Sequence, residues 1–253
     1  MTGTRQAGGR RFGGRLDPDA RGGLRLTLAA AAGLLLAVPF ALLLLLVVDH
    51  WGPLQRLDVR LDEHLNGFAF QHAGYVSFLQ GISLVGAPAT FEVLAGVIAL
   101  LLLVRRQPRL AGWLAVTVFG GGLLSTLIKV AVGRKRPLLP HPVAQALSAS
   151  FPSGHALGSV VGVGALLLVG LPYVSQSLRA PLAGLGLLIV LAIGFSRLGL
   201  GVHYLSDVIG GYILGAGWLA GTTAAFAAWR RDRGAALDRP LTEGLASAGP
   251  EQP

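Results

Sequence analysis

Three short groups of polar residues stand out in a chain that is otherwise mostly apolar, and their side chains could do chemistry together. They supply three fixed cations, two imidazoles, one carboxylate and a Pro-Ser-Gly segment: Lys129, Arg136, Pro152, Ser153, Gly154, His155, Arg197, His203 and Asp207. Cations can hold a phosphate group, one imidazole can attack it, and the other can protonate the leaving group. A membrane chain keeps such groups where they have a function, because each costs on the order of a few kcal/mol at bilayer depth.

The middle group, Pro152-Ser153-Gly154-His155, precedes a new apolar run and is therefore expected at the N-terminus of a helix. Free backbone N–H groups at such an end bind phosphate. Gly154 would let a ligand approach the backbone, and Ser153 would cap the helix or donate to a phosphate oxygen. A plain serine cap is the alternative, but a histidine beside lipid without a partner is unusual.

His203 and Asp207 are four residues apart, which would place them one turn apart on the same face of a helix. A carboxylate bonded to one imidazole nitrogen fixes the tautomer and makes the other nitrogen more nucleophilic. A purely structural His–Asp pair is the alternative at this stage.

The first group has a spacing of seven residues between Lys129 and Arg136, so a helix would place both on one face. Pro137 would then end the helix and leave Arg136 at its C-terminal rim. Arg134 and Lys135 are interpreted as membrane-edge charges that could attract anionic headgroups. A similar edge position is the alternative for Lys129.

Composition indicates that these groups are carried by an integral membrane protein of the all-α class. Of the 253 residues 53% are hydrophobic and only 13% are charged, and the mean hydropathy is +0.63. A soluble domain has about twice that charged fraction. Six apolar runs are near the ~20 residues that a spanning helix needs. They cover residues 24–48, 84–104, 110–132, 155–171, 181–195 and 207–229.

The predicted organisation is one six-span bundle over residues 23–230 with short disordered tails, 1–22 and 231–253. The first span is longer than a signal-peptide core, so we interpret it as retained. Residues 49–83 are too polar to span and are expected to form an extracytoplasmic connection. Its aromatic residues would either dip into lipid or pack as a cap over the bundle.

The arginines predict the orientation of this bundle. They cluster before the first span, in the loops near Arg105 and Arg179, and after the last span. Six crossings put these clusters on one side, which the positive-inside rule makes cytoplasmic. Both termini are therefore predicted to be cytoplasmic, with the three motifs on the extracytoplasmic side of the cell membrane. The formal charge of +9 thus reflects topology, and we expect no nucleic-acid partner.

Read in order, the three motifs resemble the signatures of the type-2 phosphatidic acid phosphatase family, also called lipid phosphate phosphatases. The patterns are Lys-x6-Arg-Pro, Pro-Ser-Gly-His and Ser-Arg-x5-His-x3-Asp, and every motif position is filled. The segment from Lys129 to Asp207 is about a third of the chain. The six-span plan extends the resemblance to most of the rest.

The resemblance implies a lipid phosphatase, and the arginine distribution predicts that its active site lies at the extracytoplasmic face. His203 would attack phosphorus and form a phosphohistidine, Asp207 would orient His203, and His155 would act as the general acid and then the general base. The phosphoryl oxygens would be bound by Lys129, Arg136, Ser153, Gly154 and Arg197. Because Asp207 is the one carboxylate in or beside the motifs, neither a metal ion nor a cofactor is expected.

Several alternatives remain open at the level of sequence. The favoured substrate is undecaprenyl pyrophosphate, with phosphatidic acid and phosphatidylglycerol phosphate as the others. A phosphotransferase that uses a lipid or sugar acceptor, or a non-catalytic lipid-binding or transport relative, would use some of the same residues. Glu92, inside the second span, could pair with a motif cation, contact the substrate headgroup or lie in water. The absence of cysteine excludes disulfides and thiolate metal sites, and the oligomeric state cannot be predicted.

Overall fold

The computed structural model describes residues 21–232, so the predicted tails lie almost wholly outside the described residues. Regular structure in the described range consists of eight α-helices and one short 3₁₀ turn. In chain order these are α2 (Arg21–Val48), α3 (Gly52–Gln71), α4 (Ala73–Val85), α5 (Pro88–Val104), α6 (Pro108–Val132), α7 (Gly154–Gly170), η1 (Leu171–Tyr173), α8 (Gln176–Gly199) and α9 (Leu205–Asp232). The all-α prediction is confirmed.

Five elements are long and apolar enough to cross a membrane: Ala73–Val104, Pro108–Val132, Gly154–Tyr173, Gln176–Gly199 and Leu205–Trp229. A sixth is reached if residues 35–48 and 52–71, which meet at an angle of 86°, count as one broken span. The second predicted span begins too late, because the apolar element that contains it starts at Ala73 and includes α4. The last part of the 49–83 connection therefore belongs to that element.

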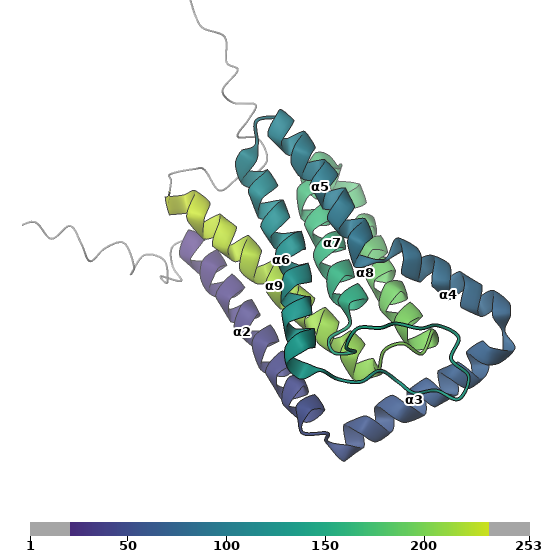
Figure 1. Cartoon of the computed structure of the whole chain (residues 1–253). Coiled ribbons are helices and arrows are strands. Elements are labelled where there is room, and N and C mark those ends of the chain that lie inside the picture. Colours follow the sequence, from purple (N-terminus) through teal and green to yellow (C-terminus); the bar gives the residue numbers. More distant parts are fainter. Residues whose placement is uncertain (1–20, 233–253) are drawn as a thin grey trace, which may run out of the picture.

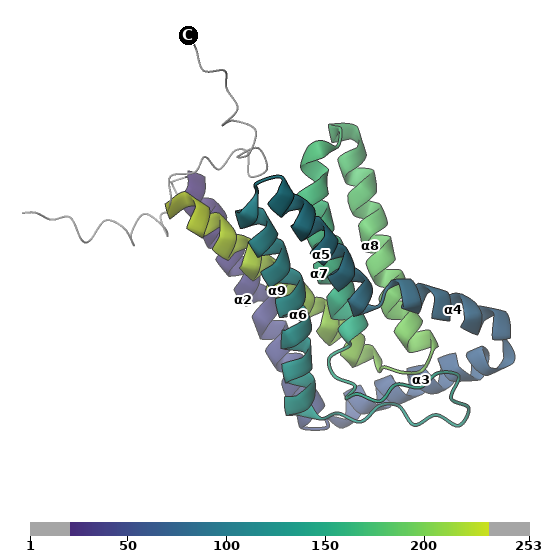
Figure 2. The same ribbon diagram turned by 45° about the horizontal axis from the view of Figure 1, so that its top comes forward.

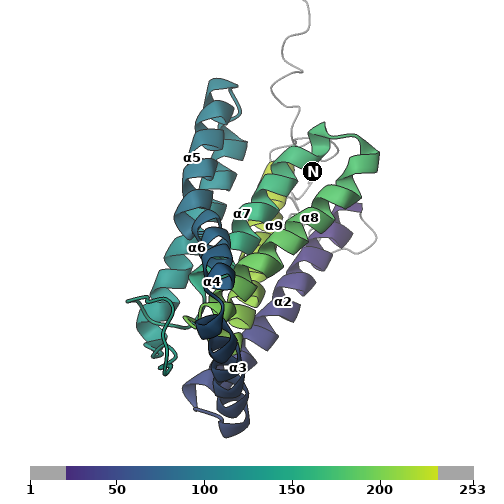
Figure 3. The same ribbon diagram turned by 90° about the vertical axis from the view of Figure 1, so that its right-hand side faces the viewer.

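The long helices lie side by side in a bundle, with α7 surrounded by α5, α6, α8 and α9 (Figure 1). Figure 3 shows α2 on one side of this group and α5 with α6 on the other. The start of α2, the end of α9 and the turns α5–α6 and α7–α8 share one end of the bundle (Figures 1 and 2). The loop after α6 and helix α3 lie at the opposite end, as does every motif.

Small residues bring α7 and α9 close together near the motif end. A Cβ at Gly211 of α9 would lie 2.6 Å from the carbonyl oxygen of Ser153 and 3.1 Å from the backbone nitrogen of Leu157. One turn further along, a Cβ at Gly215 would lie 3.0 Å from the carbonyl oxygen of Leu157. Glycines at this spacing let two membrane helices approach backbone to backbone. The second motif is thereby seated directly against α9.

Helix α3 crosses the motif end of the bundle and has an inverted distribution of side chains. Its buried residues follow helical spacing and are mostly polar: Asp58, Asp62, Asn66 and Ala69. Its aromatic residues Phe68 and Phe70 are 49% and 58% exposed. The connection therefore contains a helix, and that helix turns its carboxylates toward the bundle.

Candidate active site

The first motif is split between a helix and a loop. Helix α6 carries Lys129 in its last turn and ends at Val132, because Gly133 adopts a left-handed backbone with φ of 60°. Arg136 consequently lies in the loop after α6, and the prediction that it shares a helix face with Lys129 is wrong. The helix ends four residues before Arg136, and the signal for that end is Gly133 rather than Pro137.

The loop after α6 folds back over the site and is held by these same cations. The ammonium of Lys129 donates to the carbonyl oxygen of Ala149 at 2.6 Å. Arg136 donates from Nε to the carbonyl oxygen of Ser148 at 2.6 Å and from Nη2 to its hydroxyl at 3.2 Å. Lys129 and Arg136 are thus held near each other by adjacent carbonyl groups of this loop and not by a shared helix face.

The second motif forms the N-terminus of α7, as predicted. Ser153 is fully buried and caps the helix by accepting from the backbone N–H of Ala156 at 3.4 Å. Gly154 lies against Lys129, since a Cβ at Gly154 would be 3.8 Å from the Cε atom of Lys129. The free backbone N–H groups of this helix end therefore lie beside an ammonium group, which favours an anion.

His155 and Arg197 meet at one serine of α4. The Nε2 atom of His155 is 3.5 Å from the hydroxyl of Ser83, and Arg197 donates to the same hydroxyl. Arg197 is 9% exposed, and its Nε atom is buried without a hydrogen-bond partner among the described residues. His155 also lies within electrostatic range of Arg197, His203 and Arg136. A buried guanidinium donor that is still free is suited to an anionic ligand.

His203 precedes α9, which begins at Leu205, so the nucleophile candidate is in the turn before the helix and not on its face. Its Nε2 atom is 3.1 Å from Nη1 of Arg136, and its Nδ1 atom is 3.5 Å from Oδ2 of Asp207. A guanidinium can only donate, so Nε2 carries the lone pair and Nδ1 the proton. This is the tautomer that a nucleophilic Nε2 needs.

The protonation state of His203 agrees with this geometry. Its side chain is 2% exposed. Burial lowers the pKa of His203 to about 4, against the opposing effect of Asp207. The imidazole is therefore neutral at pH 7. A positive charge on this ring would be stabilised by the carboxylate of Asp207.

Asp207 has more partners than the motifs predict. Its Oδ1 atom accepts from Arg134 at 2.5 Å, and its Oδ2 atom accepts from the hydroxyl of Ser150 and from the backbone N–H of Tyr204 at 2.9 Å. Arg134 also reaches Asp58 of α3 at 2.8 Å and lies over the ring of Tyr204, 4.4 Å from its centroid. The interpretation of Arg134 as a membrane-edge charge is wrong, whereas Lys135 is exposed.

Arg134 keeps its charge in this buried position. Burial alone would lower its pKa, but Asp207 and Asp58 outweigh that effect and raise the pKa of Arg134 above its ordinary value. No local pattern in the sequence indicates this role, because the two carboxylates come from elements 76 and 73 residues away. The position of Arg134, two residues before the motif residue Arg136, is the one sequence feature that could have suggested this role.

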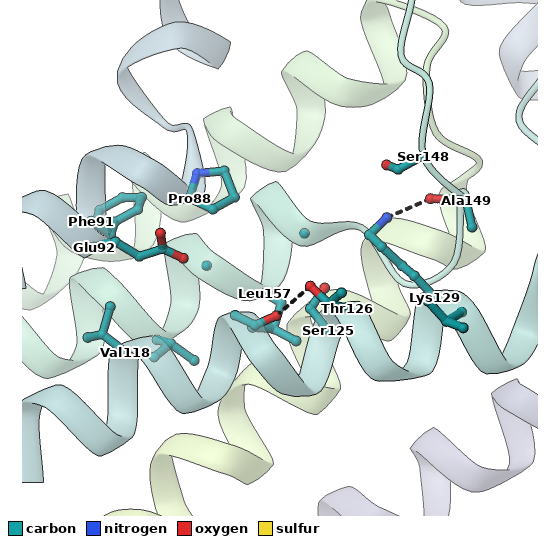
Figure 4. Close-up of a pocket in the computed structure, with 15 residues that line it drawn as sticks. Pro88, Phe91, Glu92, Val118, Ser125, Thr126, Lys129, Ser148, Ala149 and Leu157 are labelled. Carbon is teal, nitrogen blue, oxygen red and sulfur yellow. Dashed lines mark hydrogen bonds between the residues drawn. The ribbon is translucent and has the colours of Figure 1, made fainter.

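A cavity of about 470 Å³ opens from the motif end between α5, α6 and α7 (Figure 4). Lys129 and Ala149 lie at one end of it, and Phe91 and Glu92 lie at the other (Figure 4). The carboxylate of Glu92 is next to Gly122, seven residues or about 10 Å along α6 from Lys129. Within residues 21–232, no cation forms an ion pair with Glu92, so it does not pair with Lys129. Most of the remaining lining is apolar.

The described residues contain no group of three or more His, Asp, Glu or Cys side chains that could hold a metal ion. The residues around His203 are instead cations and hydrogen-bond donors. The expectation that neither a metal ion nor a cofactor takes part remains a prediction.

Comparison with known proteins agrees with this arrangement of motifs. The family model described as the PAP2 superfamily matches residues 110–231, which include all three motifs. The motif-bearing region of this chain is therefore similar to the PAP2 superfamily. The matched region begins in α6, after α2–α5, so Asp58 and Glu92 lie outside it.

Two curated proteins are similar to this chain over its motif region. Phosphatidylglycerophosphatase B of Bacillus subtilis (strain 168) is 40% identical over 108 residues, which are 41% of this chain and 52% of the relative. Lipid A 1-phosphatase of Rhizobium etli is 34% identical over 116 residues, which are 46% of this chain and 49% of the relative. The chain thus spans about half the length of the curated relatives it matches.

The fold also has a solved counterpart. The crystal structure of a transmembrane PAP2-type phosphatidylglycerolphosphate phosphatase from Bacillus subtilis superposes with a TM-score of 0.65 at 24% identity. The match covers 76% of this chain and 94% of that one. Because it extends well beyond residues 110–231, it shows that the membrane fold is shared outside the motif region.

Proposed function

We propose that this protein hydrolyses the phosphate ester of a membrane lipid through a phosphohistidine at His203. The observation that carries the proposal is the orientation of that imidazole, whose Nε2 atom faces the guanidinium of Arg136 while Nδ1 faces Asp207. In the first step Nε2 attacks phosphorus, the bond to the lipid oxygen breaks, and His155 protonates that oxygen. In the second, His155 takes a proton from water, whose oxygen attacks phosphorus while the bond between phosphorus and Nε2 of His203 breaks, and inorganic phosphate is released.

Fixed cations would stabilise the transferring group. Lys129, Arg136 and Arg197, with Ser153 and the backbone N–H of Gly154, lie at the same end of the bundle and supply donors without a metal ion. Phosphoryl transfer depends mostly on positioning and on neutralising the equatorial oxygens, so such a set is chemically sufficient. The buried, unpaired Nε atom of Arg197 supports this assignment.

The cavity between α5, α6 and α7 suits the part of a lipid that is next to its phosphate. It is mostly apolar and begins at Lys129, so a chain could enter from the bilayer while the phosphate remains at the motifs. The names of the relatives favour phosphatidylglycerol phosphate as the first substrate to test. Undecaprenyl pyrophosphate, favoured from sequence, and phosphatidic acid follow as the other candidates.

We further propose that the reaction takes place at the extracytoplasmic face of the cell membrane. The arginine-rich turns lie at the opposite end of the bundle from the motifs (Figure 1). The positive-inside rule makes that arginine-rich end cytoplasmic.

The proposal is tested by phosphate release from these three lipids by detergent-purified protein in excess EDTA. We expect EDTA-resistant release that falls at least about 1,000-fold in His203→Ala, because no other group can form the covalent intermediate. The folded state of the variant is checked by its thermal midpoint. Transfer of radiolabel to an added lipid or sugar alcohol, with little free phosphate, would indicate a phosphotransferase. Lipid binding without release would indicate a non-catalytic relative.

A further inference from the structure

The ion-pair network behind His203 extends beyond the three motifs and into α3. Arg134 bridges Oδ1 of Asp207 at 2.5 Å and Oδ2 of Asp58 at 2.8 Å. The side chain of Arg134 is 11% exposed, and those of the two carboxylates are at most 1% exposed. A planar guanidinium between two buried carboxylates fixes the geometry of both, because its donors form a rigid fork.

Ser206 closes the same network from the start of α9. Its backbone N–H donates to Oδ1 of Asp58 at 3.0 Å, and its hydroxyl lies 2.5 Å from Oδ2 of Asp58 and 2.7 Å from Arg134. Since Ser206 directly precedes Asp207, Asp58 also satisfies a free N–H group at the N-terminus of the helix that carries Asp207. One side chain of α3 is thereby tied to the start of α9.

The charges of this network decide what Asp207 can do for His203. Arg134 and Asp207 alone would form a neutral pair, whereas two carboxylates and one guanidinium leave one net negative charge. Asp62, one turn along α3 from Asp58, does not add to it. Burial, together with the charges of Asp58 and Asp207, raises the pKa of Asp62 to about 8, so Asp62 is neutral at pH 7.

We propose that Arg134 and Asp58 are positioning residues for the reaction at His203: Arg134 fixes Asp207, and Asp58 offsets the charge of Arg134 so that Asp207 can stabilise the cationic imidazole ring. The inference rests on the proposed function, in which that ring becomes positively charged as the phosphohistidine forms. It assigns a role in the reaction to α3, which lies outside the region that matches the family.

The effect can be measured through the protonation of His203, provided that the other groups around the site stay unchanged. These come from every element packed there: Lys129 of α6, Arg134 and Arg136 of the following loop, His155 of α7, Arg197 of α8, Tyr204 and Asp207 at the start of α9, and Asp58 and Asp62 of α3. Neutralising one charge in a buried network changes the stability of a nearby imidazolium in a direction given by the sign of that charge.

The experiment is the pH dependence of kcat/KM in three neutralised variants. The acid limb of this profile is the fall in kcat/KM at low pH, which we assign to protonation of His203. Asp58→Asn removes a negative charge, so the acid limb should move to lower pH. Arg134→Gln removes a positive charge and should move it to higher pH, each by about half a unit or more. The double variant should return the limb close to its wild-type position, and kcat should fall in both single variants while KM changes less.

Two further variants separate this effect from a loss of structure. Asp62→Asn alters a residue that is already neutral and should leave the limb in place, and Asp58→Glu keeps the charge and should do the same. Titration of the His203 ring by ¹⁵N NMR, assigned with His203→Gln among the six histidines, reads the same shifts without turnover. Lower activity with no opposite shifts in either readout would overturn the inference. An inactive wild type would contradict the proposed function alone, since the ring titration would still decide the inference.

Discussion

At the scale of single residues, Asp207 shows how much a buried carboxylate depends on donors that the motifs do not contain. Ser150 is fully buried and donates to Oδ2 of Asp207. Ser150→Ala leaves that lone pair unsatisfied, which costs about 1.5–3 kcal/mol for a hydrogen bond to a charged group. We expect the free energy of unfolding to fall by this amount and the thermal midpoint in detergent to fall by roughly 5 °C or more.

Ser177→Ala is the matched control, because Ser177 is exposed at the far end of the bundle and, among the described residues, its hydroxyl has one hydrogen-bond partner, Ser175. Its thermal midpoint should stay within about 1 °C of the wild-type value. Equal midpoints for the two variants would mean that the hydroxyl of Ser150 does not stabilise Asp207.

At the scale of elements, the contact between α7 and α9 decides where the second motif lies relative to the third. A Cβ at Gly211 would come within 2.6 Å of the backbone oxygen of Ser153, and backbone atoms cannot move aside as a flexible side chain can. Gly211→Ala should therefore separate the two helices and move Ser153 and His155 away from Asp207. We expect phosphate release to fall by at least about 10-fold, with a lower thermal midpoint, because overpacking costs about 1–3 kcal/mol.

Gly221→Ala on the same helix provides the comparison, since among the described residues a Cβ at Gly221 meets no atom within 4 Å. This variant should keep wild-type activity, and its stability should be equal or slightly higher because alanine favours helix more than glycine does. Wild-type activity in Gly211→Ala would show that the close approach of α7 and α9 is unnecessary for the site.

The elements and the motifs could be predicted from sequence to different extents, for physical reasons. Long apolar runs predict spanning helices by themselves, and the Ser153 cap marks the start of α7 because both signals are local. The spacing of Lys129 and Arg136 predicts a helix that reaches Arg136, but Gly133 stops α6 before that residue. Asp58 could not be assigned at all. Its partners Arg134 and Ser206 are 76 and 148 residues away, and α3 buries its acids while exposing its aromatics.

At the scale of the whole molecule, the two ends of the bundle carry different chemistry, and this predicts how the protein sits in the membrane. The motifs and α3 lie at one end, and the turns that carry Arg105 and Arg179 lie at the other (Figure 1). Because the chain contains no cysteine, single cysteines introduced at exposed positions report the side of each end without further changes. Leu147, in the loop after α6, and Ser177, at the start of α8, are both exposed and lie at opposite ends.

We expect a membrane-impermeant maleimide to label Leu147→Cys in intact spheroplasts and Ser177→Cys only after inverted vesicles are prepared or the membrane is opened. In the opposite orientation, the arginine-rich turns at the Ser177 end would have to be moved across the bilayer, which the positive-inside rule disfavours. Phosphate release from a lipid supplied to the outer surface should follow the same sidedness, since the loop that holds Arg136 also carries Leu147. Labelling of Ser177→Cys from outside, with Leu147→Cys protected, would place the reaction at the cytoplasmic face. The substrate would then have to be drawn from the inner leaflet, although the residues around His203 and their chemistry would remain the same.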